Sequence, residues 1–419
     1  MPGPAPREES PAPGRWRVLA LASALFVISQ FHRVASAVVA ADLQRDLGLS
    51  SEALGGVSAA FFYAFAVAQV PLALFLDRVG AHRSMTLLSL VGAAGAAVFS
   101  AAEGWAGATA GRVLLGVGMA GNLMGTLKLL GHWFTAREFG TVAGLVAGLG
   151  TLGNIAATTP LALLAGALGW RRAFLLSAVV TGVLALAFWL LVRERPGGAG
   201  PPQDEERLPL GRMAATLLGS RDYWLISFGA FCRYGSFVAI QGLWAGPWLV
   251  EVAGVTPLAA ANLLLLLNLA TAAGAPLGGW LSDRVLDSRR RVVLLALAGT
   301  AIAEALMALS GEGRSLPALA LLLAVFGATA SFGQVVYVHV REVMPPGMPG
   351  MAMTGVNFFV MLGAAAFLHG MGWVLDRGGA ATRSPAGFRA AFLAAAVAVA
   401  LSFLGYLATR ERRADPAGR

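Results

Sequence analysis

The sequence has little charge and almost no cysteine. Only 13% of its 419 residues are Asp, Glu, Lys or Arg, against about a quarter in an average soluble domain. The single cysteine, Cys232, excludes an internal disulfide, and no Cys and His residues stand at metal-ligand spacing. A glycine-rich nucleotide-binding loop is also absent. We therefore expect no metal, no cofactor and no ATP drive.

The sequence is rich in hydrophobic residues, which form long uninterrupted segments. Hydrophobic residues make up 57% of the chain, and its mean hydropathy is +0.70. A helix needs about 20 mainly apolar residues to cross a bilayer. Twelve runs of this kind are bounded by charge, Pro or Gly, at 16–40, 53–76, 85–103, 107–134, 140–167, 172–192, 221–250, 258–281, 292–310, 316–341, 350–376 and 386–408. The sequence thus predicts an all-α, multi-pass membrane protein with twelve transmembrane helices.

The longest polar connection, GGAGPPQDEERLPLGR, lies between the sixth and seventh runs. It divides the chain into a tail (1–15), an N-terminal six-helix bundle (16–192), a linker (193–220), a C-terminal six-helix bundle (221–408) and a second tail (409–419).

The distribution of basic residues predicts the orientation of the chain. When helix ends are counted with the adjoining loop, 20 Lys and Arg lie on the side of both termini and 7 on the other. Positive charge stays on the cytoplasmic side, so we expect both termini to be cytoplasmic and the chain to lie in the cell inner membrane. The net charge of +9 is then explained mostly by the basic residues that orient the helices in the membrane. Because the arginines are spread over short loops, we expect no nucleic-acid partner.

Two pairs of segments repeat between the halves. Residues 31–36 read FHRVAS and residues 231–236 read FCRYGS, in the first and seventh predicted helices. LFLDRVGAHR (74–83) follows the second predicted helix, and GWLSDRVLDSRRR (279–291) follows the eighth. The repeats predict two pseudo-symmetric bundles.

The loop after the second helix resembles the signature Gly-x-x-x-Asp-Arg-x-Gly-x-(Arg/Lys)-(Arg/Lys) of the major facilitator superfamily. The matching residues of the two halves are Asp77, Arg78, Gly80 and Arg83, with Asp283 and Arg284 as a weaker second copy. The resemblance covers the chain apart from its tails and central loop, and it implies transport by alternating access. Carboxylates beside arginines in a tight turn can act as a conformational latch. The alternative is that these residues only satisfy topology and cap a turn.

The fourth predicted helix is also similar to the superfamily, through its pattern Arg-x-x-x-Gly-x-Gly-x-Ala. The pattern is carried by Arg112, Gly116, Gly118 and Ala120. Small residues four apart predict close helix contact. We interpret Arg112 as structural, with a role in ion coupling as the alternative.

Two arginines lie deep inside predicted helices. Arg33 is sixteen residues past Arg17 and nine before Asp42, or about 24 Å and about 13 Å along a helix axis. Arg233 is the equivalent residue of the seventh helix. An arginine at mid-depth costs about 2.5 to 3.5 kcal/mol, so each should face a wet cavity or an anionic partner. Only Glu304 among the acidic residues lies deep in a predicted helix, which suggests that the missing anion is the substrate. Two unrelated structural arginines are the alternative.

Polar residues share the predicted faces of the two arginines. Gln30 and Ser36 lie one turn from Arg33, and Ser236 and Gln241 follow Arg233. The resemblance implies that the first, fourth, seventh and tenth helices line a central cavity. Further candidates for substrate binding are Lys128, which is the only lysine of the chain and could equally extend to the membrane interface, and the neutral Tyr337 and Asn357.

The arginine pair resembles that of the organophosphate/phosphate antiporters of the superfamily, and HWF (132–134) resembles the anion/cation symporters. Met119 occupies the place where those symporters commonly carry a protonatable Glu. The remaining candidates for coupling transport to a proton or another ion are therefore His32, Arg112 and Glu304. His32 is a candidate because an imidazole titrates near neutral pH.

We accordingly expect a monomeric secondary transporter of small organic anions, carboxylates or phosphate esters, that works as an anion exchanger or a proton-coupled symporter. Two alternatives stay open: an exporter of drugs, siderophores or other amphiphiles, and a membrane sensor of anions. An enzyme is not expected, because no nucleophile and base pair is evident in the apolar runs.

Overall fold

The computed structural model describes residues 14–195, 210–311, 313–345, 349–377 and 384–411. Within these ranges the chain is helical and contains no strand, as predicted. Eleven helices of the described residues are long and apolar enough to cross a membrane. The prediction of an all-α, multi-pass membrane protein is confirmed.

The first half of the chain forms nine helices in the described ranges. They are α1 (Arg15–Val38), α2 (Ala40–Leu47), α3 (Ser51–Val79), α4 (Ala81–Ser100), α5 (Trp105–Met119), α6 (Asn122–Trp133), α7 (Ala136–Ala156), α8 (Thr159–Leu168) and α9 (Trp170–Leu191). Two predicted spans are interrupted. The run 107–134 pauses between α5 and α6 at Ala120 and Gly121, and the run 140–167 pauses between α7 and α8, where Pro160 supplies no backbone N–H.

The second half is also helical, with three turns of tighter or wider winding. Its α-helices are α10 (Leu210–Leu218), α11 (Arg221–Ala239), α12 (Ala245–Glu251), α13 (Pro257–Trp280), α14 (Arg289–Ala308), α15 (Leu316–Phe332), α16 (Val336–Val343), α17 (Pro349–Arg377) and α18 (Pro385–Tyr406). A π-helical turn, Ile240–Trp244, joins α11 to α12, another, Leu281–Val285, follows α13, and a 3-10 turn, Gly333–Val335, joins α15 to α16.

The predicted seventh span, 221–250, is not among the eleven apolar helices. It corresponds to α11, the π-helical turn and α12, which follow one another without a break from Arg221 to Glu251. Three charged residues in α11, Arg221, Asp222 and Arg233, lower its hydropathy. The span is long enough for a bilayer, since 31 residues of helix rise by about 46 Å.

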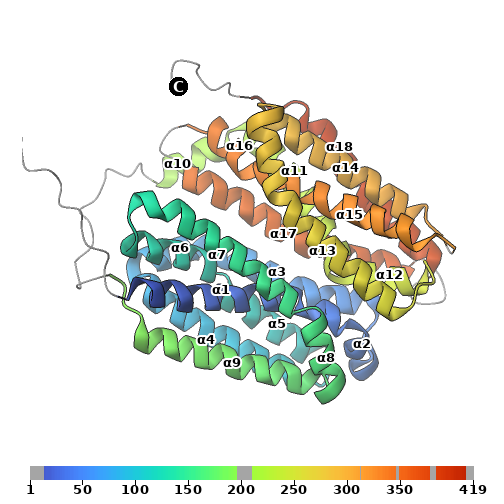
Figure 1. Cartoon of the computed structure of the whole chain (residues 1–419), viewed down its shortest axis with the longest axis horizontal. Coiled ribbons are helices and arrows are strands. Elements are labelled where there is room, and N and C mark those ends of the chain that lie inside the picture. Colours follow the sequence, from blue (N-terminus) through green and yellow to red (C-terminus); the bar gives the residue numbers. More distant parts are fainter. Residues whose placement is uncertain (1–13, 196–209, 312, 346–348, 378–383, 412–419) are drawn as a thin grey trace, which may run out of the picture. The chain divides into compact units, whose positions relative to one another are not determined.

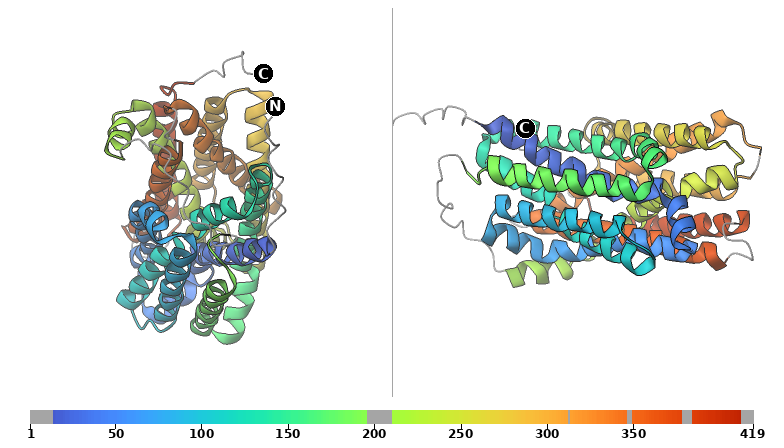
Figure 2. Two further views of the ribbon diagram at one scale, coloured as in Figure 1. Left: turned by 90° about the vertical axis from the view of Figure 1, so that its left-hand side faces the viewer. Right: turned by 90° about the horizontal axis from the view of Figure 1, so that it is seen from below.

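The chain falls into two compact units. One holds the described residues of Met1–Ala35, Ala68–Ala101 and Leu114–Gln203, and the other holds those of Ser36–Val67, Ala102–Val113 and Asp204–Arg419. In the first unit α4 packs along α9 (Figure 1). In the second, α11 packs along α17, α13 along α15, and α14 along α18 (Figures 1 and 2). The predicted bundle boundaries stay a prediction.

Close backbone contact in the first unit depends on glycine. A Cβ on Gly118 of α5 would lie 2.2 Å from the backbone nitrogen of Gly92 in α4, so Gly118 cannot carry a larger side chain unless the two helices move apart. Gly118 is one of the small residues for which the sequence predicts helix contact.

In the second unit the start of α3 is attached to the end of α17. The Asp376 carboxylate accepts hydrogen bonds from the backbone N–H groups of Ser51 at 2.9 Å and Glu52 at 2.7 Å. These amides belong to the first turn of α3, where backbone N–H groups have no acceptor within the helix. The same turn carries the positive end of the helix dipole, which favours a carboxylate. His369 Nε2 lies 4.0 Å from Glu52 Oε1 in the same contact.

Candidate functional site

Arg233 is buried in α11, with 4% of its surface exposed. Its Nη1 donates to the backbone oxygen of Ala330, in the last turn of α15. There the α-helical ladder stops and the chain enters the 3-10 turn at Gly333. The carbonyls at the end of a helix lack intrahelical donors and carry its negative dipole end, so they suit a cation.

Gly333 makes room for this arginine. A Cβ at position 333 would lie 2.0 Å from Arg233 Nε and 2.2 Å from its Cζ. Any other residue here would therefore displace the guanidinium. In the described part of the chain Arg233 forms no ion pair with a carboxylate, and its partner is a neutral carbonyl.

Several predicted polar residues lie around Arg233. The buried Ser236 hydroxyl donates to the backbone oxygen of Arg233 at 3.2 Å. The Tyr337 hydroxyl, which interacts electrostatically with the guanidinium, donates to Asn357 Oδ1 at 2.9 Å. The structure thus brings four of the predicted residues of the second half together.

Gln241 lies apart from this group, in the π-helical turn after α11. Its Nε2 donates to Asn268 Oδ1 of α13 at 2.6 Å, and Asn268 in turn donates to the Leu264 carbonyl at 2.8 Å. Sequence reasoning missed Asn268, although an amide within the apolar run LLLLLNLA was a signal that it has a polar partner.

In the first unit Arg33 is half-buried in α1, and Gln30 one turn earlier is half-buried too. The preceding His32 is fully buried against α9, with its Nε2 3.4 Å from Thr181 Oγ1. Ser36, one turn after Arg33, is buried. How Arg33 lies relative to Arg233 stays a prediction.

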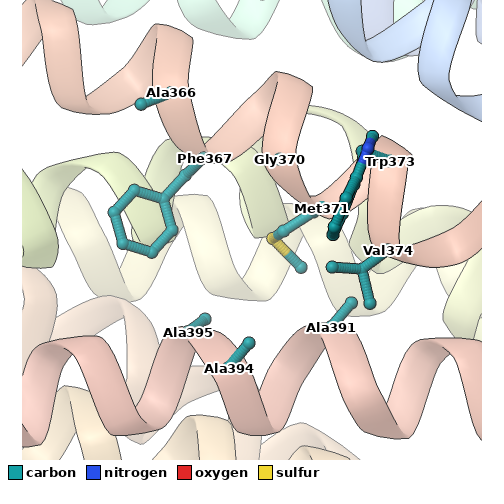
Figure 3. Close-up of a pocket in the computed structure, with 9 residues that line it drawn as sticks. All are labelled: Ala366, Phe367, Gly370, Met371, Trp373, Val374, Ala391, Ala394 and Ala395. Carbon is teal, nitrogen blue, oxygen red and sulfur yellow. The ribbon is translucent and has the colours of Figure 1, made fainter.

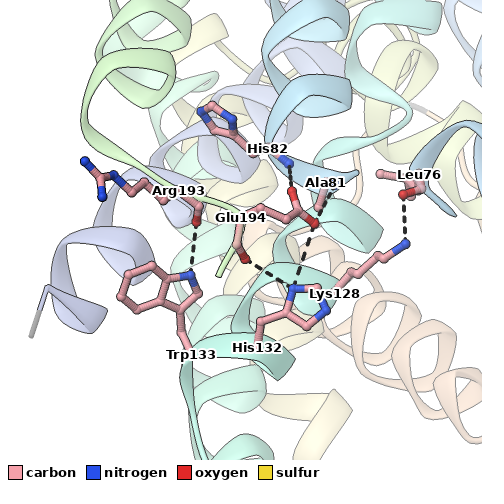
Figure 4. A network of polar contacts seen from close by, with 8 residues as sticks. All are labelled: Leu76, Ala81, His82, Lys128, His132, Trp133, Arg193 and Glu194. Carbon is pink, nitrogen blue, oxygen red and sulfur yellow. Dashed lines mark hydrogen bonds and ion pairs between the residues drawn. The ribbon is translucent and has the colours of Figure 1, made fainter. Parts of the chain in front are cut away.

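Lys128 of α6 is engaged with the end of α3 in Figure 4. Its Nζ donates to the Leu76 carbonyl at 2.8 Å, which places the cation at the negative end of that helix. Its role in substrate binding stays a prediction. The same figure shows Glu194, which sequence reasoning missed.

Glu194 caps the helix that follows the first loop signature. Its carboxylate accepts from the backbone N–H groups of Ala81 at 3.0 Å and His82 at 2.7 Å, at the start of α4 (Figure 4). Gly80, which precedes them, has a φ of 90°, a conformation that L side chains rarely adopt. The side chain of Asp77 lies outside the described residues, and those of Arg78 and Arg83 are exposed.

In the second loop signature the pairing is between Asp283 and Arg289. Arg289 also donates to Glu342 Oε1 at 3.2 Å and to Ser282 Oγ at 2.7 Å. Arg284 is exposed. The predicted carboxylate Asp283 thus contacts Arg289, which is not the predicted Arg284, and whether this cluster acts as a latch stays a prediction.

A histidine in each half binds the backbone just beyond the last helix of that half. His132 Nδ1 lies 3.2 Å from the Glu194 carbonyl, and His339 Nε2 lies 3.0 Å from the Arg410 carbonyl. A carbonyl only accepts, so these ring nitrogens carry the proton. Nδ1 of His339 then accepts from the Tyr406 hydroxyl, 2.5 Å away.

The two remaining candidates for coupling, Arg112 and Glu304, are both fully buried. The Arg112 guanidinium lies 4.7 Å from the centre of the Phe61 ring, and it donates to the Ser58 carbonyl at 3.4 Å. Whether Arg112 is structural or takes part in coupling stays a prediction. Neither carboxyl oxygen of Glu304 receives a hydrogen bond from the described residues.

A pocket of about 280 Å³ lies between α17 and α18 (Figure 3). Its lining includes Phe367, Met371, Trp373 and alanines of both helices, and it contains no ionisable side chain. Such a lining suits an apolar chain and offers nothing to an anion. Among the described residues no group of three or more His, Cys, Asp and Glu side chains is placed to hold a metal ion.

Known proteins similar to this chain are transporters. The probable sulfoacetate transporter of Cupriavidus necator is 27% identical over 309 residues, which are 68% of this chain and 70% of that protein. The glycerol-3-phosphate transporter of Bacillus subtilis is 27% identical over 285 residues, 60% of each chain. The hexuronate transporter of Escherichia coli is 25% identical over 307 residues, 67% of this chain and 70% of that protein.

Solved transporter structures have the same fold. A bacterial homologue of the human lysosomal transporter Spinster superposes with a TM-score of 0.78 at 17% identity, over 94% of this chain and 96% of that one. The nucleoside transporter NupG superposes with a TM-score of 0.74 at 13% identity, over 94% and 98%. The sequence model of the Major Facilitator Superfamily matches residues 19–244 and 226–419. Because these matches extend over nearly the whole chain, the protein belongs to the Major Facilitator Superfamily.

Proposed function

We propose that this protein carries small organic anions, carboxylates or phosphate esters, across the cell inner membrane by alternating access. Arg33 and Arg233 contact the anion, and both termini face the cytoplasm. The relatives are named as a probable sulfoacetate transporter, a glycerol-3-phosphate transporter and a hexuronate transporter, and these three substrates are anions at neutral pH. That shared charge supports an anionic substrate here.

The observation that carries the proposal is the environment of Arg233. A mid-membrane arginine costs about 2.5 to 3.5 kcal/mol, and a hydrogen bond to a charged group returns about 1.5 to 3 kcal/mol. The Ala330 carbonyl thus offsets much of the cost, but as a neutral acceptor it leaves the positive charge of the guanidinium in place. A carboxylate or phosphate would bring a full negative charge and two parallel acceptors to the planar guanidinium.

Charge compensation also explains why the carrier would move when it is loaded. An empty site would leave the Arg233 guanidinium with a neutral carbonyl and no negative charge beside it, which opposes closure. A bound anion neutralises this charge and lowers that barrier. Exchange of one anion for another follows directly, and net transport needs a second ion such as a proton.

The test is counterflow in proteoliposomes that contain the purified full chain. Radiolabelled glycerol 3-phosphate, sulfoacetate, tartrate and glucuronate are compared with the neutral uridine. We expect at least one anion to exchange and uridine not to. Arg33→Gln and Arg233→Gln should abolish exchange, and Arg33→Lys and Arg233→Lys should weaken it, because lysine offers no planar pair of donors.

Arg45→Gln is the matched control, since Arg45 is exposed in α2 and pairs with Asp42 and Asp46. It should exchange anions like the wild type. Exchange that persists in both arginine-to-glutamine variants would contradict the proposal and would favour the exporter of amphiphiles, whose cavity does not need the charge.

A further inference from the structure

Glu304 is a carboxyl group buried among apolar residues. It stands in the sequence AIAEALMA of α14, is 0% exposed, and receives no hydrogen bond from the described residues. The Ser236 hydroxyl and the Cys232 thiol of α11 interact with it. Among the described residues no Arg, Lys or His forms an ion pair with it.

The Ser236 hydroxyl can donate its one proton either to the Arg233 carbonyl, 3.2 Å away, or to Glu304. With its proton on the carbonyl, the hydroxyl oxygen offers Glu304 only lone pairs. An ionised carboxylate would be repelled by them, whereas a carboxylic acid can donate its own proton to the hydroxyl oxygen.

Solvation leads to the same result. An ionised carboxylate without a partner costs several kcal/mol when it is taken out of water. The elements that pack against α14 are α11, α15, α16, α18, the 3-10 turn and the π-helical turn Leu281–Val285. Of these elements, α15 and the 3-10 turn carry no titratable residue. The titratable residues of α11 are Arg221, Asp222, Tyr223, Cys232, Arg233 and Tyr234. Those of the other elements are Tyr337, His339, Arg341 and Glu342 on α16, Arg389 and Tyr406 on α18, and Asp283 and Arg284 in the π-helical turn. Of these, Cys232 interacts with the carboxyl, and it brings no positive charge.

We propose that Glu304 is a proton-binding site that couples anion transport to the proton gradient. The inference rests on the proposed function. In the described state Glu304 is the neutral acid. When the pathway admits water in another conformation, the acid O–H gives its proton to a water molecule, which becomes hydronium and leaves, and the carboxylate stays behind.

Ser236 transmits this change to the anion site. Once Glu304 is ionised, the Ser236 hydroxyl turns to donate to the carboxylate and releases the Arg233 carbonyl. One hydroxyl proton thus serves two acceptors in alternation, one on α14 and one in the turn of α11 that bears the substrate-binding arginine. Protonation of Glu304 and the arrangement of Arg233 are linked without direct contact between their side chains.

The experiment separates exchange from proton-driven accumulation in proteoliposomes of the full chain, with glycerol 3-phosphate, sulfoacetate, tartrate and glucuronate as probes. Glu304→Gln replaces the acid by a neutral amide of the same shape. We expect it to retain counterflow, which needs no net proton movement, and to lose accumulation driven by a pH gradient. Glu103→Gln, at an exposed position, should keep both.

Accumulation by Glu304→Gln that matches the wild type would overturn the inference. Because an inactive variant could simply be misfolded, infrared difference spectra on pH change provide a second measurement. The wild type should show the carbonyl stretch of a protonated carboxylic acid that Glu304→Gln lacks, and its absence from the wild type would also overturn the inference. Failure of the wild type to exchange any anion would instead refute the proposed function.

Discussion

Replacement of Gly333 by alanine tests the contact on which the site depends. A Cβ at this position would lie 2.0 Å from Arg233 Nε, far inside van der Waals contact. The guanidinium is the far end of a flexible side chain, so it will move away and lose its hydrogen bond to the Ala330 carbonyl. A hydrogen bond to a charged group contributes about 1.5 to 3 kcal/mol. We expect Gly333→Ala to lose about that much stability.

The measurement is thermal unfolding followed by intrinsic tryptophan fluorescence, together with the affinity for whichever anion exchanges. A double-mutant cycle isolates the contact, because in the background of Arg233→Gln the alanine meets a shorter side chain and should cost little. Gly370→Ala is the control, since no atom lies within 4 Å of the position of its Cβ. An equal effect of Gly333→Ala in both backgrounds would refute the reasoning.

Three further predictions concern the supports of the fold. Asp376→Ala should destabilise the protein by about 0.5 to 2 kcal/mol, the usual cost of a lost helix cap. Hydrogen exchange should become faster at the amides of the first turn of α3, and an unchanged exchange rate there would contradict the contact. Gly118→Ala should cost about 1 to 3 kcal/mol through overpacking against Gly92, as measured by thermal unfolding, and a neutral effect would show that the helices can separate freely. The hydrogen bond from the Thr135 backbone N–H lowers the pKa of Glu138. The stability that this bond contributes is therefore present above about pH 4.3 and is lost as the pH falls through the lowered pKa. Acid titration of unfolding should show this loss in the wild type and not in Glu138→Gln.

The helices could be predicted from the sequence because each must cover a bilayer with apolar residues. That requirement is local, and it recovers the spans even where a helix is interrupted, as at Pro160. The seventh span was also found, although its charged residues lower its hydropathy, because its length and its neighbours remained apolar. Gly80 was predicted from its place in the loop signature, and its positive φ gives the physical reason.

The partners of the buried polar groups could not be predicted. The Arg233 side chain reaches a carbonyl 97 residues away, at a helix break that depends on how α15 meets α11. Glu194 caps a helix that begins 113 residues earlier. Nothing in the neighbourhood of either residue in the sequence specifies the contact, because it arises from the packing of helices that are distant along the chain.

The carbonyl that holds Arg233 has a kinetic meaning for a carrier. Under the proposed function, an incoming anion competes with this acceptor for Arg233, so the free energy of binding is the difference between two contacts rather than the full strength of one. Such a site releases its cargo readily, because the backbone takes the guanidinium back as the anion departs. Turnover is favoured over retention, and a chain that held Arg233 less firmly at the end of α15 would bind more tightly and deliver more slowly.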